Sequence, residues 1–129
     1  MIPLRVSATP ELLRQVLRNA LENAINYTPS GGQVSLHIFA DGRDDVIEVI
    51  DDGPGIPVAE RDRVFDSFFR LPGSHGFGSG IGLAIARESA TRLGAAVSLH
   101  GWPDRAGLVF RYRQPRKRDN MARKSPGTA

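Results

Sequence analysis

Three groups of polar and small residues in this 129-residue chain have types and spacings that suit chemistry. The first is a set of asparagines: Asn19 and Asn23 are four residues apart in a segment of helical pattern, and Asn26 follows. This spacing brings Asn19 and Asn23 to one flank of the helix's apolar stripe, where a helix can form the wall of a cleft. An amide oxygen is a neutral, hard ligand that suits Mg²⁺ when phosphates supply the remaining charge. Taken alone, the pair is more typical of half-exposed asparagines that hydrogen-bond to loop backbone.

The second group is an acid at the end of a predicted strand, followed by two glycines. Alternation over residues 46–51 places Ile47, Val49 and Asp51 on one face, so Asp51 faces the core if the two apolar residues do. A carboxylate near a core is costly unless it accepts hydrogen bonds, which the exocyclic amine of a nucleobase could donate. Gly53 and Gly55 allow the backbone to approach a flat ligand closely. An ordinary acidic turn has the same pattern.

The third group is a glycine-rich segment that opens a predicted helix. A helix N-terminus presents unpaired backbone N–H groups and favours anions, and the glycines suit a mobile lid. The segment lacks the Gly-Lys-Ser/Thr of a Walker loop and the spacing of a Rossmann turn. From this segment alone, a flexible surface loop is an equally good interpretation. Its glycines are Gly73, Gly76, Gly78, Gly80 and Gly82.

The elements around these groups predict an α+β fold. Thr9-Pro10-Glu11 predicts a helix start with a hydroxyl N-cap, and residues 28–32 end that helix. A short helical stretch is expected over 58–65, and a second long helix from Gly80 to Gly94. Four strands with interspersed helices predict one sheet with helices packed on one face. The strands are expected at 34–38, 46–51, 97–100 and 108–113.

Composition indicates a single folded domain with a basic tail. Hydrophobic residues make up 40% and charged residues 24% of the chain, and there is no cysteine, which excludes disulfide and thiolate chemistry. No stretch approaches the roughly 18 apolar residues of a membrane span, and the N-terminus lacks a signal-peptide core, so we expect an intracellular chain. Of the net charge of +3, residues 114–129 carry +4 and residues 1–113 carry −1. We therefore expect a domain over 1–113 and a disordered tail over 114–129.

In order and spacing, these segments resemble the ATP-binding catalytic domain of sensor histidine kinases, in the GHKL superfamily. Residues 17–29 are similar to the family's N box, 51–57 to its G1 box, 64–70 to its F box and 78–85 to its G2 box. The resemblance covers nearly all of residues 4–113. It implies a two-layer α/β sandwich of the Bergerat type, with one mixed, mostly antiparallel sheet covered on one face by about three helices.

The resemblance also implies the roles of individual residues toward ATP and Mg²⁺. Asp51 would accept the adenine amino proton, and Asn23 would ligate the metal. Asn19, from the same wall, and Arg70, which could reach the γ-phosphate, would be the catalytic residues, whereas Phe65 and Phe68 would anchor the lid in the core. The residues implied to bind the nucleotide are Asn19, Asn23, Tyr27, Asp51, Gly53, Gly55, Ile56, Arg70, Gly78, Gly80, Gly82 and Leu83.

Asn19 separates the branches of this superfamily. In the gyrase, Hsp90-type and mismatch-repair ATPases and in anti-sigma serine kinases, the equivalent residue is typically a glutamate base. An amide cannot accept a proton usefully at neutral pH, so Asn19 favours transfer to an already nucleophilic imidazole over hydrolysis. Three residues depart from the family pattern: Asn26 replaces a phosphate-contacting lysine, and Ala95 and Leu108 replace a glycine and a hydroxyl residue.

The acceptor histidine is expected outside this chain, because His37, His75 and His100 are not followed by the acid and arginine of a phosphoacceptor helix. We expect a monomeric catalytic fragment from the cytoplasmic portion of an inner-membrane sensor, with a dimerisation domain and a response regulator as partners. One alternative is a GHKL ATPase or stand-alone serine kinase, which would hydrolyse ATP without a helical partner. The other is a nucleic-acid-binding module, whose salt-dependent binding would be lost with residues 114–129.

Overall fold

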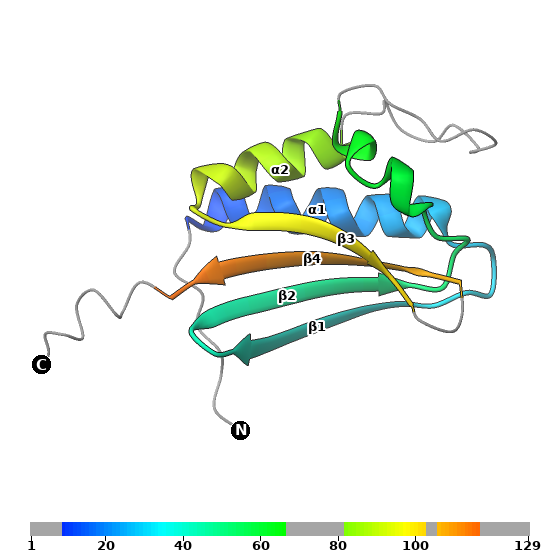
Figure 1. Cartoon of the computed structure of the whole chain (residues 1–129), viewed down its shortest axis with the longest axis horizontal. Helices are drawn as coiled ribbons and strands as arrows, with labels where there is room; N and C mark the ends of the chain where they lie inside the picture. The colour runs from blue at the N-terminus through cyan, green and yellow to red at the C-terminus, as the bar shows by residue number, and fades with distance from the viewer. Residues whose placement is uncertain (1–8, 67–81, 103–105, 117–129) are drawn as a thin grey trace, which may run out of the picture.

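The computed structural model describes residues 9–66, 82–102 and 106–116. These residues form two layers, because both α-helices lie on the same side of a four-stranded sheet (Figure 1). The elements are α1 (Pro10–Tyr27), β1 (Val34–Asp41), β2 (Asp44–Asp51), the 3-10 turns η1 (Val58–Glu60) and η2 (Arg63–Phe65), α2 (Gly82–Arg92), β3 (Ala96–Gly101) and β4 (Leu108–Pro115). The predicted α+β sandwich is confirmed.

The sheet has the strand order β1-β2-β4-β3, so β2 and β4 are central. Whereas a mixed, mostly antiparallel sheet was expected, all the described strands pair antiparallel. A two-residue turn joins β1 to β2 after the Asp41–Asp44 pair, and Gly42 takes a φ of 63° there, as glycine readily does. Asp51 pairs with Val34 of β1 on one side and with Leu108 of β4 on the other.

Helix α1 begins at Pro10, as predicted, but the predicted hydroxyl cap is wrong, because the Thr9 side chain makes no capping hydrogen bond. Val16, Ala20 and Ala24 recur every four residues and form the buried face of the helix. Thr28 leaves the helix in an extended conformation, and its hydroxyl donates to the carbonyl oxygen of Ala24 at 2.7 Å.

Helix α2 ends in a Schellman motif around the predicted glycine. Gly94 has a φ of 76°; its N–H donates to the Thr91 carbonyl oxygen at 3.0 Å, and the Ala95 N–H donates to that of Ala90 at 2.9 Å. The predicted start near Gly80 lies outside the described residues. None of the helices in the described part of the chain combines the length and the apolar character that a membrane span needs.

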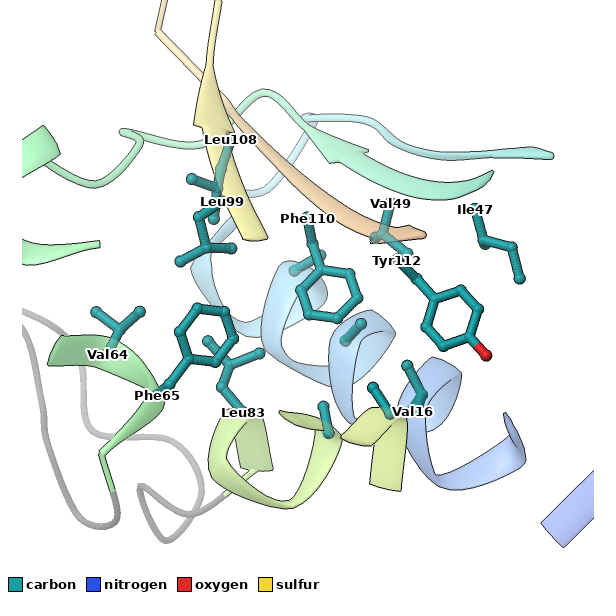
Figure 2. Close-up of a cluster of buried hydrophobic side chains, with 14 of the residues drawn as sticks. Val16, Ile47, Val49, Val64, Phe65, Leu83, Leu99, Leu108, Phe110 and Tyr112 are labelled. Carbon is teal, nitrogen blue, oxygen red and sulfur yellow. The ribbon is translucent and has the colours of Figure 1, made fainter. Parts of the chain in front are cut away.

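The core lies between the sheet and the helices (Figure 2). Strand residues such as Phe110 point toward helical residues such as Leu83, and Phe65 of η2 is buried among them, as expected. Phe68 lies outside the described residues. The labelled core side chains are Val16, Ile47, Val49, Val64, Phe65, Leu83, Leu99, Leu108, Phe110 and Tyr112.

The helices leave the edge strand β1 largely uncovered. Leu36 and Ile38 share the helix-facing side of the sheet with their partners Val49 and Ile47, yet they are 45% and 50% exposed. The reason is that α1 packs mainly on α2 and β2. The alternating apolar residues therefore predict a strand here, but they do not predict whether its side chains are buried.

The folded part of the chain extends past the domain end predicted at residue 113. Strand β4 runs to Pro115, and the next residue, Arg116, pairs with Asp45, with 3.2 Å between Nε and Oδ1. Beside this pair, the Tyr112 hydroxyl donates to Gln114 Oε1 at 2.6 Å, and burial and the Asp45 charge raise the pKa of Tyr112 to about 12. This buried polar cluster lies at the opposite end of β2 from Asp51, and residues 117–129 are not described.

Candidate functional site

The predicted site residues that the structure describes gather at one end of the sandwich. Strand β2 ends there with Asp51, α1 ends there with Tyr27, and the described part of α2 begins there with Gly82 (Figure 1). Residues that are far apart in the sequence are brought together because α1 and α2 lie side by side over the central strands.

Asp51 is a buried carboxylate with a raised pKa. Asp51 is only 5% exposed, and its Oδ1 accepts a hydrogen bond from the Gly53 N–H at 2.9 Å. Burial raises the pKa of Asp51 above 3.8, the charge of Asp52 adds to the rise, and the backbone N–H groups of Gly53 and Leu108 oppose it. A further hydrogen-bond donor from a ligand would therefore stabilise the ionised carboxylate.

Asn23 and Asp51 line the same cavity, between α1 and the sheet. Its volume is about 10 Å³, which is room for about one water molecule, so a purine enters only if the lining elements move apart. One residue from α1 and one from β2 therefore line the same small space, and their roles toward a nucleotide stay predictions. Apart from them, the lining is apolar: Ala20, Ala24, Val49, Leu83, Leu99, Leu108 and Phe110.

Asn19 lies one helical turn before Asn23, against the start of α2. Its Nδ2 donates to the carbonyl oxygen of Gln15 at 2.8 Å. Its Oδ1 lies close to Gly82, because a Cβ added to that glycine would be 3.4 Å away. Asn19 thus connects the segments that resemble the N box and the G2 box, although it does not line the small cavity.

The two glycines that follow Asp51 make room for the chain's own backbone. A Cβ on Gly53 would lie 2.7 Å from the carbonyl oxygen of Tyr27, closer than such atoms approach. Gly55 has a φ of 80°, and a Cβ there would lie 3.0 Å from the carbonyl oxygen of Gly107. The loop after Asp51 is therefore held between the end of α1 and the turn before β4.

The remaining predicted residues are placed as follows. Tyr27 is half-buried and contacts the loop through its backbone, and its side chain does not line the cavity. The Leu83 side chain points into the core, so only its backbone is available to phosphates. Arg70, Gly78 and Gly80 lie outside the described residues, and their roles stay predictions.

The apolar wall of the cavity was not assigned to the site from the sequence. Leu99, Leu108 and Phe110 all lie on the helix-facing side of β3 and β4. The sequence pattern that could have identified these three residues is the alternation of side chains within the predicted strands 97–100 and 108–113. This alternation puts the three apolar side chains on one face of the sheet and Arg111 on the other. Leu108 was noted only as a departure from the family pattern.

A magnesium ion at this site would depend on Asn23 and on the ligand. In the described ranges, no group of three or more histidine, cysteine, aspartate or glutamate side chains could hold a metal. Mg²⁺ is commonly held by one or two protein oxygens together with substrate phosphates and waters, so the amide oxygen of Asn23 fits the ion only when phosphates are present.

The fold and the arrangement at this end of the sandwich are those of an ATP-binding domain. The chain belongs to the family of histidine kinase-, DNA gyrase B- and HSP90-like ATPases, whose model matches residues 8–118. Membership of this family carries ATP binding with it. The match contains every helix and strand described above.

Within this family, the similar proteins are sensor histidine kinases. The adaptive-response sensory kinase SasA of Rippkaea orientalis is 38% identical over 112 residues, which cover 85% of this chain but only 28% of SasA. The mycobacterial sensor histidine kinase MprB has a similar structure, with a TM-score of 0.74 and 32% identity over 83% of this chain and 72% of that one. Full-length ShkA in complex with AMPPNP has a TM-score of 0.67 and 34% identity, over 81% of this chain and 21% of that one.

These comparisons confirm the resemblance to histidine kinase catalytic domains. The chain spans between a fifth and a third of the length of the curated relatives it matches. It corresponds to the ATP-binding catalytic region of such kinases and not to their full length.

Proposed function

We propose that this chain binds Mg-ATP and transfers the γ-phosphoryl group to a histidine on a dimerisation domain of the same protein. The observation that carries the proposal is the shared cavity of Asn23 and Asp51, which offers a metal ligand and a nucleobase acceptor from opposite layers. The complex of the similar kinase ShkA with AMPPNP, an ATP analogue, supports the nucleotide part of the proposal.

Asp51 would recognise the adenine ring. Its buried carboxylate would accept a hydrogen bond from the exocyclic amino group, and such a bond is strong because it is charge-assisted and shielded from water. The apolar side chains of Val49, Leu99 and Leu108 would contact the ring. The start of α2, which contributes Leu83 to the lining of the cavity, must move outward to admit the ring.

The other predicted residues would hold the phosphates. Asn23 would ligate Mg²⁺, which neutralises and orients the β- and γ-phosphates. The start of α2, with Gly78, Gly80 and Gly82, would donate backbone N–H groups to phosphate oxygens, and Arg70 would neutralise the γ-phosphate. Asn19 would keep the start of α2 against α1.

Phosphoryl transfer needs no base from this chain. The lone pair of a neutral imidazole nitrogen attacks the γ-phosphorus while the bond to the β–γ bridging oxygen breaks, and ADP leaves. Asn19 offers no proton acceptor that would activate water. We further propose that this chain acts as a monomer in the cytoplasmic part of a membrane sensor, and that a response regulator receives the phosphoryl group.

The test is phosphorylation of the phosphoacceptor domain of the full-length protein by this chain and γ-labelled ATP. We expect acid-labile, base-stable phosphate on the acceptor, and its loss in Asn23→Ala. Glu22→Ala is the matched control, because Glu22 lies on the same helix but is exposed and pairs with Arg18 on the surface. Rapid ATP hydrolysis without the acceptor would favour the ATPase alternative, and salt-sensitive RNA or DNA binding without ATP binding would favour the nucleic-acid alternative.

A further inference from the structure

Arg61 turns its charged group toward the loop that follows Asp51. Its Nε donates to the carbonyl oxygen of Ile56 at 2.9 Å. Ile56 is only 7% exposed and belongs to the buried core, so this bond fixes a backbone group that lies next to Gly55. A guanidinium bond to a carbonyl is charge-assisted and is stronger than a bond between neutral groups.

The end of β3 is shaped to receive the same guanidinium. A Cβ on Gly101 would lie 2.7 Å from Nη2 of Arg61, so the glycine leaves space that the arginine fills. The neighbouring His100 is half-buried, and burial together with the charges of Arg111 and Arg61 lowers its pKa. A neutral His100 does not repel Arg61 from this position.

Among the described residues, the hydrogen bonds of this loop lie mainly at its two ends: the Asp52 N–H donates to the Gln33 carbonyl oxygen at 3.3 Å, and the Glu60 N–H donates to that of Pro57 at 2.8 Å. Pro54 and Pro57 have no N–H to donate, and the Gly53 N–H is bonded to Asp51. Gly55 lies close to the Gly107 carbonyl group, because a Cβ on Gly55 would be 3.0 Å from its oxygen. The bond from Arg61 therefore restrains the part of the loop after Gly55, which the bond to Asp51 does not reach.

We propose that Arg61 is a positioning residue for the nucleobase: by linking the Ile56 carbonyl to the end of β3, it keeps the loop after Asp51 in place beside the adenine ring when the cavity opens to admit that ring. The proposal rests on the proposed function, because it concerns the fit of the same ring. Arg61 acts through the Ile56 backbone and not by contact with the phosphates.

The test compares ATP with inorganic tripolyphosphate, both with Mg²⁺, on the full 129-residue chain. Trp102, the single tryptophan, lies against Gly107 beside the loop and provides a fluorescence signal. We expect Arg61→Ala to weaken ATP binding about tenfold, the effect of losing one hydrogen bond to a charged group, and to leave tripolyphosphate binding unchanged. Arg61→Lys, which keeps a charged donor, should recover part of the loss.

Arg63→Ala is the matched control, because Arg63 is an exposed arginine on the same segment and pairs with Glu60. It should bind ATP like the original chain. An Arg61→Ala variant that binds ATP equally well, or that loses ATP and tripolyphosphate binding to the same extent, would overturn the positioning role. If the unaltered chain itself does not bind ATP, the proposed function fails instead.

Gly101→Ala gives an independent test of the link to β3. The new methyl group must displace Nη2, so we expect a smaller loss of ATP affinity in the same direction. In the Arg61→Ala background the same change should cost no further affinity, because the group that it displaces is gone. Equal losses in both backgrounds would contradict the link.

Discussion

Replacing Asp51 with asparagine changes the chemistry of the cavity with almost no change in shape. The carboxylate that accepts the Gly53 N–H bond at 2.9 Å becomes an amide, which can still accept that bond through its oxygen. The other carboxylate oxygen is replaced by an NH₂ group, so that side of the side chain changes from a hydrogen-bond acceptor to a donor. It would then face the adenine amino group, which is also a donor.

The expected magnitude follows from the burial of this group. A hydrogen bond to a charged group contributes about 1.5–3 kcal/mol, and Asp51 is shielded from the water that would otherwise compensate for its loss. The dissociation constant for ATP should therefore rise by about 10- to 150-fold. Guanine presents a carbonyl oxygen where adenine presents its amino group, so the preference for ATP over GTP should fall by at least about tenfold.

Titration with ATP and GTP, followed by calorimetry or by Trp102 fluorescence, measures both quantities. Asp52→Asn is the matched control: the adjacent acid is exposed, and its Oδ1 accepts the Gln33 N–H at 2.9 Å instead of lining the cavity. This variant should bind ATP within about twofold of the original chain. An Asp51→Asn variant that folds and keeps both its ATP affinity and its ATP preference would refute the role of Asp51.

Three further predictions concern pH, packing and stability. Because the pKa of Asp51 is raised, ATP affinity should fall as the pH drops toward that pKa, while the pH response of Asp51→Asn, measured in parallel by calorimetry, should be flatter. Gly53→Ala should weaken ATP binding and lower the melting temperature by calorimetry, because its Cβ would lie 2.7 Å from the backbone of α1. Arg116→Ala should lower the free energy of unfolding in urea by about 3 kcal/mol, since it removes the cation paired with the 1% exposed Asp45. In contrast, Arg14→Ala, which breaks an exposed pair, should change it by less than about 1 kcal/mol.

The features that the sequence predicted well are those set by neighbouring residues. Pro10 marks the start of α1 and Gly94 the end of α2, because proline and glycine act on the backbone locally. The burial of Asp51 follows from its alternation with Ile47 and Val49 in a central strand. The alternation therefore predicts that Asp51 lies at the core, as it does in the structure.

The features that the sequence did not predict depend on contacts between distant segments. Leu36 and Ile38 have the alternation of a buried strand, but their exposure depends on where α1 crosses the sheet. The pairing of Arg116 with Asp45 joins the residue after β4 to the start of β2, and no local pattern indicates it. The bond from Arg61 to the Ile56 carbonyl likewise depends on the path of an irregular loop.

A crystal structure of this chain with Mg²⁺ and a non-hydrolysable ATP analogue is the most direct test of the account. We predict that the adenine amino group lies about 3 Å from a carboxylate oxygen of Asp51. We also predict that Mg²⁺ lies about 2.1 Å from the amide oxygen of Asn23. An analogue bound with its adenine away from Asp51, or a metal bound without Asn23, would contradict the central claim.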